Sequence, residues 1–335
     1  MKEDYSSLWK LPAEVTIIEE IVGEGFAAEP TFIPTETKAW LVRELMKAGC
    51  THFQVSNFGN PKIMPQFRDC EELYVRLGRP EGVSFQAPAL NMRALERIKK
   101  LKETGCGPGS VELLIATTDA FNYANVNKST EDQWKVMTPM VRVAREAGLE
   151  ITGGIGGCWT CLENGDKVTA EVAQSFAERW MDLGVDRLTH CEGTKKGQVS
   201  PKAVYEYFCR VLDKYPDPKM HTFHLHDAYG WGVPCCIAAM QAGITRFEIC
   251  LGGLQGGPEP GIMDLVPSVS SDLRPPVDVR AAPAMGLTPT EDFVSICEAM
   301  GVRTGFNVDK LLNVGRWLER IVGRRLKSIR QRWQG

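Results

Sequence analysis

A repeated pattern of helix, glycine and strand is the feature of this chain that most limits its fold. Short segments ending near a glycine follow amphipathic stretches, and most precede a short apolar run. Glycine suits the position just after a helix, which usually needs a positive φ. The pattern therefore predicts a helix, a tight turn and a strand, many times over. The segments are "KAGC" 47–50, "ETGC" 103–106, "EAGL" 146–149, "DLGV" 182–185, "QAGI" 241–244 and "AMGV" 299–302.

Eight apolar runs are predicted to be β-strands, with helical stretches between them. Apolar strands that alternate with helices are typical of a parallel sheet buried on both faces. Eight such units predict an α/β fold of the (β/α)8 TIM-barrel type. An open doubly wound sheet is the alternative, although "VGEGFAAE" is a poor match to its G-x-G-x-x-G loop. The strands are 15–20, 52–56, 82–87, 111–116, 150–155, 186–191, 221–226 and 246–251; the helices are 36–48, 91–103, 129–147, 167–183, 199–214 and 233–242.

The 335 residues are predicted to form one barrel domain, 1–335. Residues 1–14 are expected to be an N-terminal extension and 305–333 a C-terminal helix. Between them, 256–287 is expected to be a long, proline-rich loop at the barrel mouth. Long ordered loops at such a place are usually functional.

Charge and composition exclude several classes of protein. The net charge is −3, from 39 basic and 42 acidic residues, which gives no reason to expect nucleic acid as a partner. The N-terminus lacks the apolar stretch of a signal peptide, and no apolar run approaches the ~18 residues of a membrane span. Eleven scattered cysteines favour reduced thiols and a cytoplasmic location.

The run "HTFHLHDAYGWG" (221–232) holds three of the five histidines. His224 and His226 are two residues apart, so a strand directs both side chains to one face. At the C-terminal end of a barrel strand, two imidazoles on one face predict half of a metal site. Structural, hydrogen-bonded histidines are the alternative. His221 has the other parity and is expected to pack against a helix.

A carboxylate is the ligand that two histidines most often need to complete a facial metal site. After the first predicted strand, Glu24 lies between two glycines and can reach over the mouth from a tight loop. A solvent-facing loop glutamate is the alternative, and the local sequence does not decide between them.

Eight segments, in order along the chain, carry a family resemblance. The chain resembles the hydroxymethylglutaryl-CoA lyase branch of the DRE-type metal-dependent TIM-barrel lyases and synthases. The H-x-H-D-x-Y-G element is the most specific of them. The segments are "GEGFAAE" 23–29, "FGNPKIMPQ" 58–66, "TTDAFNYANVNKS" 117–129, "CLENGDKVTAEVA" 161–173, "HLHDAYGWG" 224–232, "GGLQGGP" 252–258, and "TPTEDFV" with "TGFNVDKLL" near 288–312.

The resemblance implies a divalent cation, Mg²⁺, Mn²⁺ or Zn²⁺, held by Glu24, His224 and His226. It implies that Asp227 orients this site; a helix N-cap near Gly232 is the alternative role. It also implies a small-molecule substrate such as a CoA thioester, and a homodimer.

Other positions depart from the family pattern. Gly23 stands where the family has an arginine that stabilises an enolate, and Glu24 is one methylene longer than the usual aspartate. Gln54 replaces a glutamate, Gly257 a cysteine, and Leu287 an asparagine that often completes the metal shell. The metal ligands are therefore kept while much of the lyase machinery differs.

The end of the sixth strand, "THCEGTKKG", offers candidate catalytic groups. His190 is a candidate general base, because the pKa of a histidine lies near neutrality. Lys195 is a candidate for the charge stabilisation that the missing arginine would supply. Packing and surface roles are the alternatives.

We therefore expect a metal-dependent lyase that breaks a carbon–carbon bond next to a carbonyl, by retro-aldol or retro-Claisen chemistry. Its substrate resembles hydroxymethylglutaryl-CoA or is another hydroxyacyl or aldol compound. Two alternatives remain: a condensing synthase of the same superfamily, and a barrel that has lost catalysis and acts as a binding protein.

Overall fold

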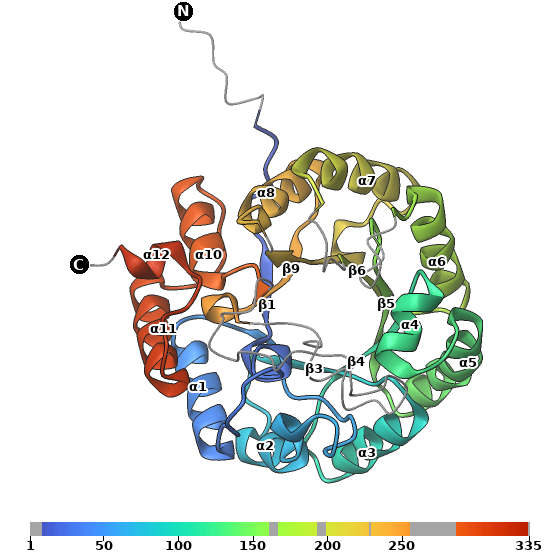
Figure 1. Cartoon of the computed structure of the whole chain (residues 1–335), viewed down its shortest axis with the longest axis horizontal. Coiled ribbons are helices and arrows are strands. Elements are labelled where there is room, and N and C mark those ends of the chain that lie inside the picture. Colours follow the sequence, from blue (N-terminus) through green and yellow to red (C-terminus); the bar gives the residue numbers. More distant parts are fainter. Residues whose placement is uncertain (1–8, 161–166, 193–198, 228, 255–285, 334–335) are drawn as a thin grey trace, which may run out of the picture.

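Eight parallel strands close into a barrel in the order β1-β2-β3-β4-β5-β6-β7-β9 (Figure 1). The computed structural model describes residues 9–160, 167–192, 199–227, 229–254 and 286–333. The predicted (β/α)8 barrel is confirmed. The strands are β1 (Thr16–Glu19), β2 (His52–Gln54), β3 (Ser84–Pro88), β4 (Ser110–Ala116), β5 (Glu150–Gly156), β6 (Arg187–Cys191), β7 (His221–His224) and β9 (Arg246–Ile249), with a small antiparallel pair of β8 (His226–Asp227) and β10 (Gly286–Leu287).

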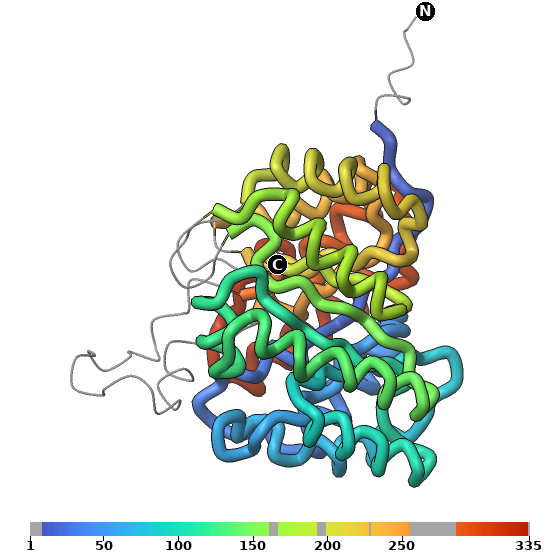
Figure 2. Tube along the Cα trace, turned by 90° about the vertical axis from the view of Figure 1, so that its right-hand side faces the viewer, coloured from blue at the N-terminus to red at the C-terminus, as the bar shows by residue number. Residues whose placement is uncertain are grey.

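A ring of helices surrounds the barrel, and α10, α11 and α12 fill the ring between α8 and α1 (Figure 1). Figure 2 shows the helices from the middle of the chain, coloured cyan to olive, lying side by side along the outside. None of the described helices has the length and apolar character needed to cross a membrane. The helices are α1 (Thr35–Lys47), α2 (Cys70–Leu77), α3 (Met92–Glu103), α4 (Asp119–Val126), α5 (Thr130–Glu146), α6 (Ala170–Asp182), α7 (Pro201–Lys214), α8 (Gly232–Ala242), α10 (Thr290–Ala299), α11 (Val308–Val322) and α12 (Ile329–Arg332).

The helix ends show why the sequence pattern predicted this fold. The glycines of the six repeated segments all have φ between 65° and 114°, the left-handed region that ends a helix: Gly49, Gly105, Gly148, Gly184, Gly243 and Gly301. At the other end of a helix, the side chain of Ser129 accepts a hydrogen bond from the Asp132 amide and caps α5.

The C-terminal segment differs from the prediction of one helix over 305–333. α11 stops at Val322 because Gly323 takes a left-handed conformation with φ of 73°. A second, short helix, α12, then begins after Ser328, whose hydroxyl accepts a hydrogen bond from the Gln331 amide. Most of the predicted mouth loop, 256–287, and residues 1–8 of the predicted extension lie outside the described residues.

The barrel interior is polar, in contrast to its outer face. Phe223 and Phe247 point outward and pack against Phe208 of α7 and Phe293 of α10. Inside, Gln86 Nε2 of β3 donates a hydrogen bond of 2.8 Å to Glu248 Oε1 of β9, which lies across the lumen and is separated from β3 by β1 and β2. Barrels of this type are usually filled by branched aliphatic side chains. Buried polar groups beneath the mouth therefore need a functional explanation.

Candidate metal centre

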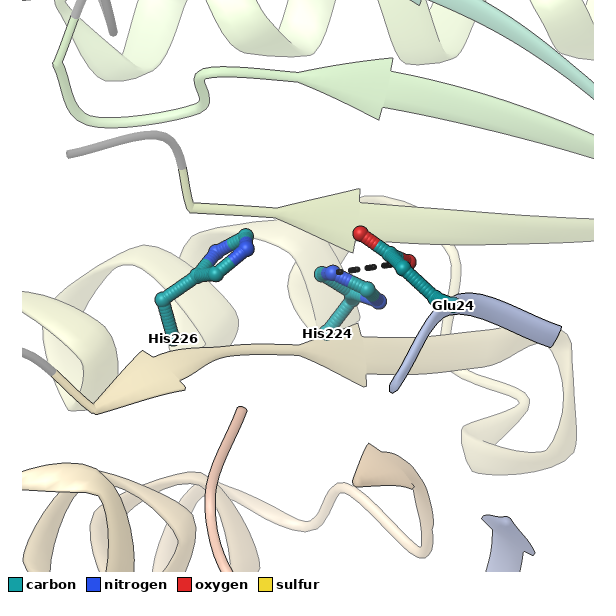
Figure 3. Close-up of side chains that lie close together, drawn as sticks. All are labelled: Glu24, His224 and His226. Atoms are coloured by element: carbon teal, nitrogen blue, oxygen red, sulfur yellow. Dashed lines mark ion pairs between the residues drawn. The ribbon is translucent and has the colours of Figure 1, made fainter. Parts of the chain in front are cut away.

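β7 and β8 bring His224 and His226 to the same side of the sheet, where both rings are almost fully buried (Figure 3). His224 Nδ1 lies 3.2 Å from Glu248 Oε2, and His226 Nδ1 lies 3.0 Å from the Glu192 carbonyl oxygen. Because a carboxylate and a carbonyl accept hydrogen bonds, both rings are held as Nδ1–H tautomers. Nε2 is then the ligating nitrogen of each ring. The predicted shared face of the H-x-H pair is confirmed.

Glu24 reaches the two histidines from a five-residue π-helical turn, Ile21–Gly25, directly after β1 (Figure 3). Its Oε2 atom lies 3.9 Å from His224 Nε2. Both neighbouring glycines are needed for this turn. A Cβ on Gly23 would lie 2.4 Å from the Gln54 carbonyl oxygen, and one on Gly25 would lie 2.6 Å from Cys250 Sγ. The turn is therefore pressed against β2 and the end of β9, and the side chain between the glycines is directed over the mouth.

The segment after this turn is anchored by a buried glutamine. Gln66 Nε2 donates to the carbonyl oxygens of Glu29 and Thr31, and its Oε1 accepts from the Ile33 amide at 3.1 Å. Lys38 is fully buried beside it and donates to the Gln66 carbonyl and, at 2.8 Å, to Asp69 Oδ1. These bonds fix the path of the chain that leaves Glu24.

Glu24, His224 and His226 each offer a ligand atom within 4.8 Å of the other two. Two imidazoles and one carboxylate are the donor set of many facial metal sites, and such sites leave coordination positions open for a substrate. The residues predicted as metal ligands thus lie together, and their donors fit a divalent transition-metal ion or Mg²⁺. Glu248 and the Glu192 carbonyl supply the outer hydrogen bonds that usually orient metal-binding histidines.

The surroundings of His224 are strongly acidic. Burial by itself would lower the pKa of His224, but its hydrogen bond to Glu248 and the charges of Glu24, Glu248 and Glu112 together raise that pKa to about 9. Burial, followed by the charges of neighbouring carboxylates, raises the pKa of Glu20 and of Glu112 well above the ordinary value. This end of the lumen therefore favours cations.

Sequence reasoning missed Glu112 and Glu248 altogether. Each is an acid in the middle of a short apolar run, "VELLIA" and "RFEICL", where a charged residue has to be explained. Glu20 is the last residue of the first predicted strand, 15–20, and the sequence pattern predicts no role for its side chain. It points into the lumen, whereas Glu19 points outward and accepts hydrogen bonds from the Ile21 and Leu251 amides.

His190 is placed away from the mouth, so its predicted role as a general base there is wrong. It lies on the outer face of β6, fully buried, with Nδ1 2.9 Å from the Tyr207 hydroxyl of α7 and Nε2 3.1 Å from His221 Nδ1. Burial lowers its pKa well below the ordinary value. His190 shares the parity of Leu188, an apolar residue that packs in the core, and this signal was available in the sequence. His221 packs outward, as predicted.

The other predicted residues fall in three groups. Asp227 Oδ1 accepts a hydrogen bond of 3.1 Å from the Gly232 amide, the first of α8, so it satisfies a helix-end amide as its alternative role implies, although Trp231 occupies the N-cap position. Leu287 of β10 is buried and pairs with His226. Lys195 and Gly257 lie outside the described residues.

Comparisons with known proteins place this chain among lyases. The "HMGL-like" family model matches residues 15–318. The hydroxymethylglutaryl-CoA lyase of Bacillus subtilis is 27% identical over 95% of this chain and 96% of its own length. The (R)-citramalyl-CoA lyase of Chloroflexus aurantiacus is 26% identical over 94% of this chain and 93% of its own.

Solved structures show the same fold. The crystal structure of the Bacillus subtilis HMG-CoA lyase gives a TM-score of 0.81 at 26% identity, covering 96% of this chain and 98% of that one. An HMG-CoA lyase from Acinetobacter baumannii, solved in complex with coenzyme A and 3-methylmalate, gives a TM-score of 0.83 at 24% identity, covering 96% and 95%. Since the family model matches nearly the whole barrel, the chain belongs to the HMGL-like family.

Proposed function

We propose that this protein is a divalent-metal-dependent lyase that cleaves a carbon–carbon bond in a hydroxyacyl-CoA thioester. The observation that carries the proposal is the meeting of Glu24, His224 and His226 at the barrel mouth, in a family whose matching relatives are named as lyases of hydroxymethylglutaryl-CoA and (R)-citramalyl-CoA. Both names describe hydroxyacyl thioesters, and a retro-aldol type of cleavage suits such substrates.

Glu24, His224 and His226 would hold the ion at the barrel mouth. When bound, a divalent ion polarises a carbonyl and eases the loss of a proton from a neighbouring hydroxyl. Glu248 and the Glu192 carbonyl keep both imidazoles in the ligating tautomer, and the turn held by Gly23 and Gly25 keeps Glu24 in reach. The protein thus fixes the orientation of Glu24, His224 and His226 before a substrate binds.

The bond changes of this cleavage balance without a further reactant. The hydroxyl loses its proton to a base and becomes a carbonyl, while the adjacent C–C bond breaks. Its electron pair forms the enolate of the shorter thioester, which then takes up a proton. Lys195 remains our candidate for the cation beside this enolate. We expect Lys195→Ala to lower kcat more than it raises KM, since the enolate charge exists only after the bond begins to break.

The direct test is cleavage of hydroxymethylglutaryl-CoA and citramalyl-CoA by the purified protein with Mn²⁺, followed by mass spectrometry of the thioester products. We expect one of these substrates, or a close hydroxyacyl analogue, to be cleaved, and His226→Ala to abolish turnover without unfolding the protein. His221→Asn is the matched control, because His221 faces away from the site. Full activity of His226→Ala, or of protein stripped of metal with EDTA, would refute the proposal.

A further inference from the structure

Below the mouth, a second group of polar side chains lies on the other side of the His224 ring. Glu20 follows β1, Gln54 ends β2 and Glu248 belongs to β9; all three are buried. β1 and β2 pair in parallel, with Glu19 opposite Phe53, so Glu20 and Gln54 occupy the next neighbouring positions. β1 also neighbours β9. Three adjacent strands therefore bring these side chains into one part of the lumen.

The two carboxylates of this group, Glu20 and Glu248, lie near Nδ1 of His224, whereas Glu24 lies near Nε2. Glu248 Oε2 lies 3.2 Å from Nδ1, and Glu20 Oε2 lies 3.8 Å from it. Glu20, His224 and Glu248 each place a ligand atom within 4.8 Å of the other two. The group is centred on Nδ1 of His224, whereas the mouth ligands lie toward Nε2; the two groups meet at this imidazole and where the Glu20 carboxyl interacts with that of Glu24.

Several oxygens of this group have no hydrogen-bond partner in the part of the chain that the structure describes. Both carboxylate oxygens of Glu20 and Oε1 of Gln54 are buried in this state. A buried oxygen without a partner loses the hydrogen bonds that water would give it, and a buried charge loses much more. Elsewhere in the lumen, Gln86 and Glu248 do hydrogen-bond to each other. The unpartnered oxygens therefore point to a missing ligand that accepts electron pairs.

The charge of the lumen points the same way. Among the described residues, Glu20 and Glu248 have no lysine or arginine within ion-pair distance, and His224 is the one cationic group that both approach. Two buried carboxylates that share one cationic neighbour favour the binding of further positive charge.

We propose that the lumen holds a second, inner divalent cation of the hard type, such as Mg²⁺ or Mn²⁺, between the carboxylates of Glu20 and Glu248. The amide oxygen of Gln54 is a further donor on the same side. Carboxylate and amide oxygens are the ligands that hard divalent cations prefer. His224 keeps its Nδ1–H on Glu248, because an ionised carboxylate can accept a hydrogen bond and bind a cation at once. The inner site does not depend on lyase activity.

The test counts Mn²⁺ ions in the whole protein, first by anomalous scattering from crystals soaked in MnCl₂ and then by calorimetric titration. We expect an anomalous peak between Glu20 and Glu248 in the unaltered chain, besides one at the mouth. Glu20→Gln should lose the inner ion and keep the mouth ion, whereas His226→Ala should keep the inner ion. Glu112→Gln is the matched control: this buried lumen acid is not part of either ligand group and should leave both ions bound.

The outcomes separate this inference from the proposed function. Suppose that the protein binds a single ion, which is lost in His226→Ala and kept in Glu20→Gln. This result would refute the inner site and leave the lyase proposal standing, and the Glu20 carboxyl would then be protonated. Two ions in a protein that cleaves no hydroxyacyl thioester would support the inner site and refute the lyase. Thermal melting of each variant shows whether it folds, and the anomalous map of the unaltered chain needs no variant.

Discussion

Gly23→Ala is the change that tests the geometry of the Glu24 turn most directly. The added Cβ would lie 2.4 Å from the Gln54 carbonyl oxygen and 2.6 Å from Gln54 Cγ, about 1 Å inside an ordinary contact. The first of these atoms is backbone within a barrel strand, so the turn has to move instead. Overpacking of this kind costs about 1–3 kcal/mol of unfolding free energy. A shift of about 1 Å would also take Glu24 out of reach of a shared ion.

We therefore expect Gly23→Ala to unfold at lower urea concentration and to bind Mn²⁺ at the mouth at least tenfold more weakly, as measured by denaturation and calorimetry. Gly23→Arg should behave no better, so the arginine of related enzymes would not rescue activity. Gly109→Ala is the control, since a Cβ there meets nothing closer than 4.0 Å and its φ is not in the left-handed region. Stability within about 0.5 kcal/mol of the parent protein, together with unchanged Mn²⁺ affinity, would refute the close packing of this turn.

Three further predictions concern other parts of the molecule. Without metal, His224 carries a proton below its raised pKa of about 9, so an incoming ion must displace that proton. The Mn²⁺ affinity should therefore rise from pH 7 toward pH 9 and level off above pH 9. An affinity independent of pH would contradict this prediction. His190→Leu should keep full turnover but lose about 1–3 kcal/mol of stability, because the Tyr207 hydroxyl and His221 lose a buried partner; lost turnover at unchanged stability would restore its role as a base. Lys38→Met should cost about 3–5 kcal/mol in urea denaturation, because Asp69 is left buried without its cation; a cost below about 1 kcal/mol would show that water solvates Asp69.

The fold was predictable because its signals are local and repeated. A glycine in the left-handed region ends a helix whatever surrounds it, and all six repeated glycines do so. The alternation of side chains along β7 and β8 was equally local: His224 and His226 share one face and His221 takes the other. Counting eight such units was then enough to predict closure of the barrel.

The lumen was not predictable in the same way, because its chemistry depends on which strands face each other across the barrel. Glu112 and Glu248 are far apart in sequence, and only the closed sheet brings them near His224. The predicted placement of His190 at the mouth failed for a related reason. A strand end lies near the mouth, but His190 alternates in step with Leu188, so its side chain points outward. The close packing of the turn at Gly23 could not be predicted from the sequence either, because it depends on the backbone of the neighbouring strand, β2.

Gly23 and the lumen acids have a joint consequence for the order of binding. The packed turn leaves no room for a cationic side chain at position 23, while Glu20, Glu24 and Glu248 all lie around one imidazole. A CoA thioester with an acidic acyl group is itself an anion and would be repelled by such a site. Under the proposed function, we therefore expect a cation from solution to bind first and the metal-loaded protein to be the form that accepts an anionic substrate. Under that function, a bound metal ion would therefore have two roles: it would activate the substrate, and it would supply positive charge that the described residues around His224 lack.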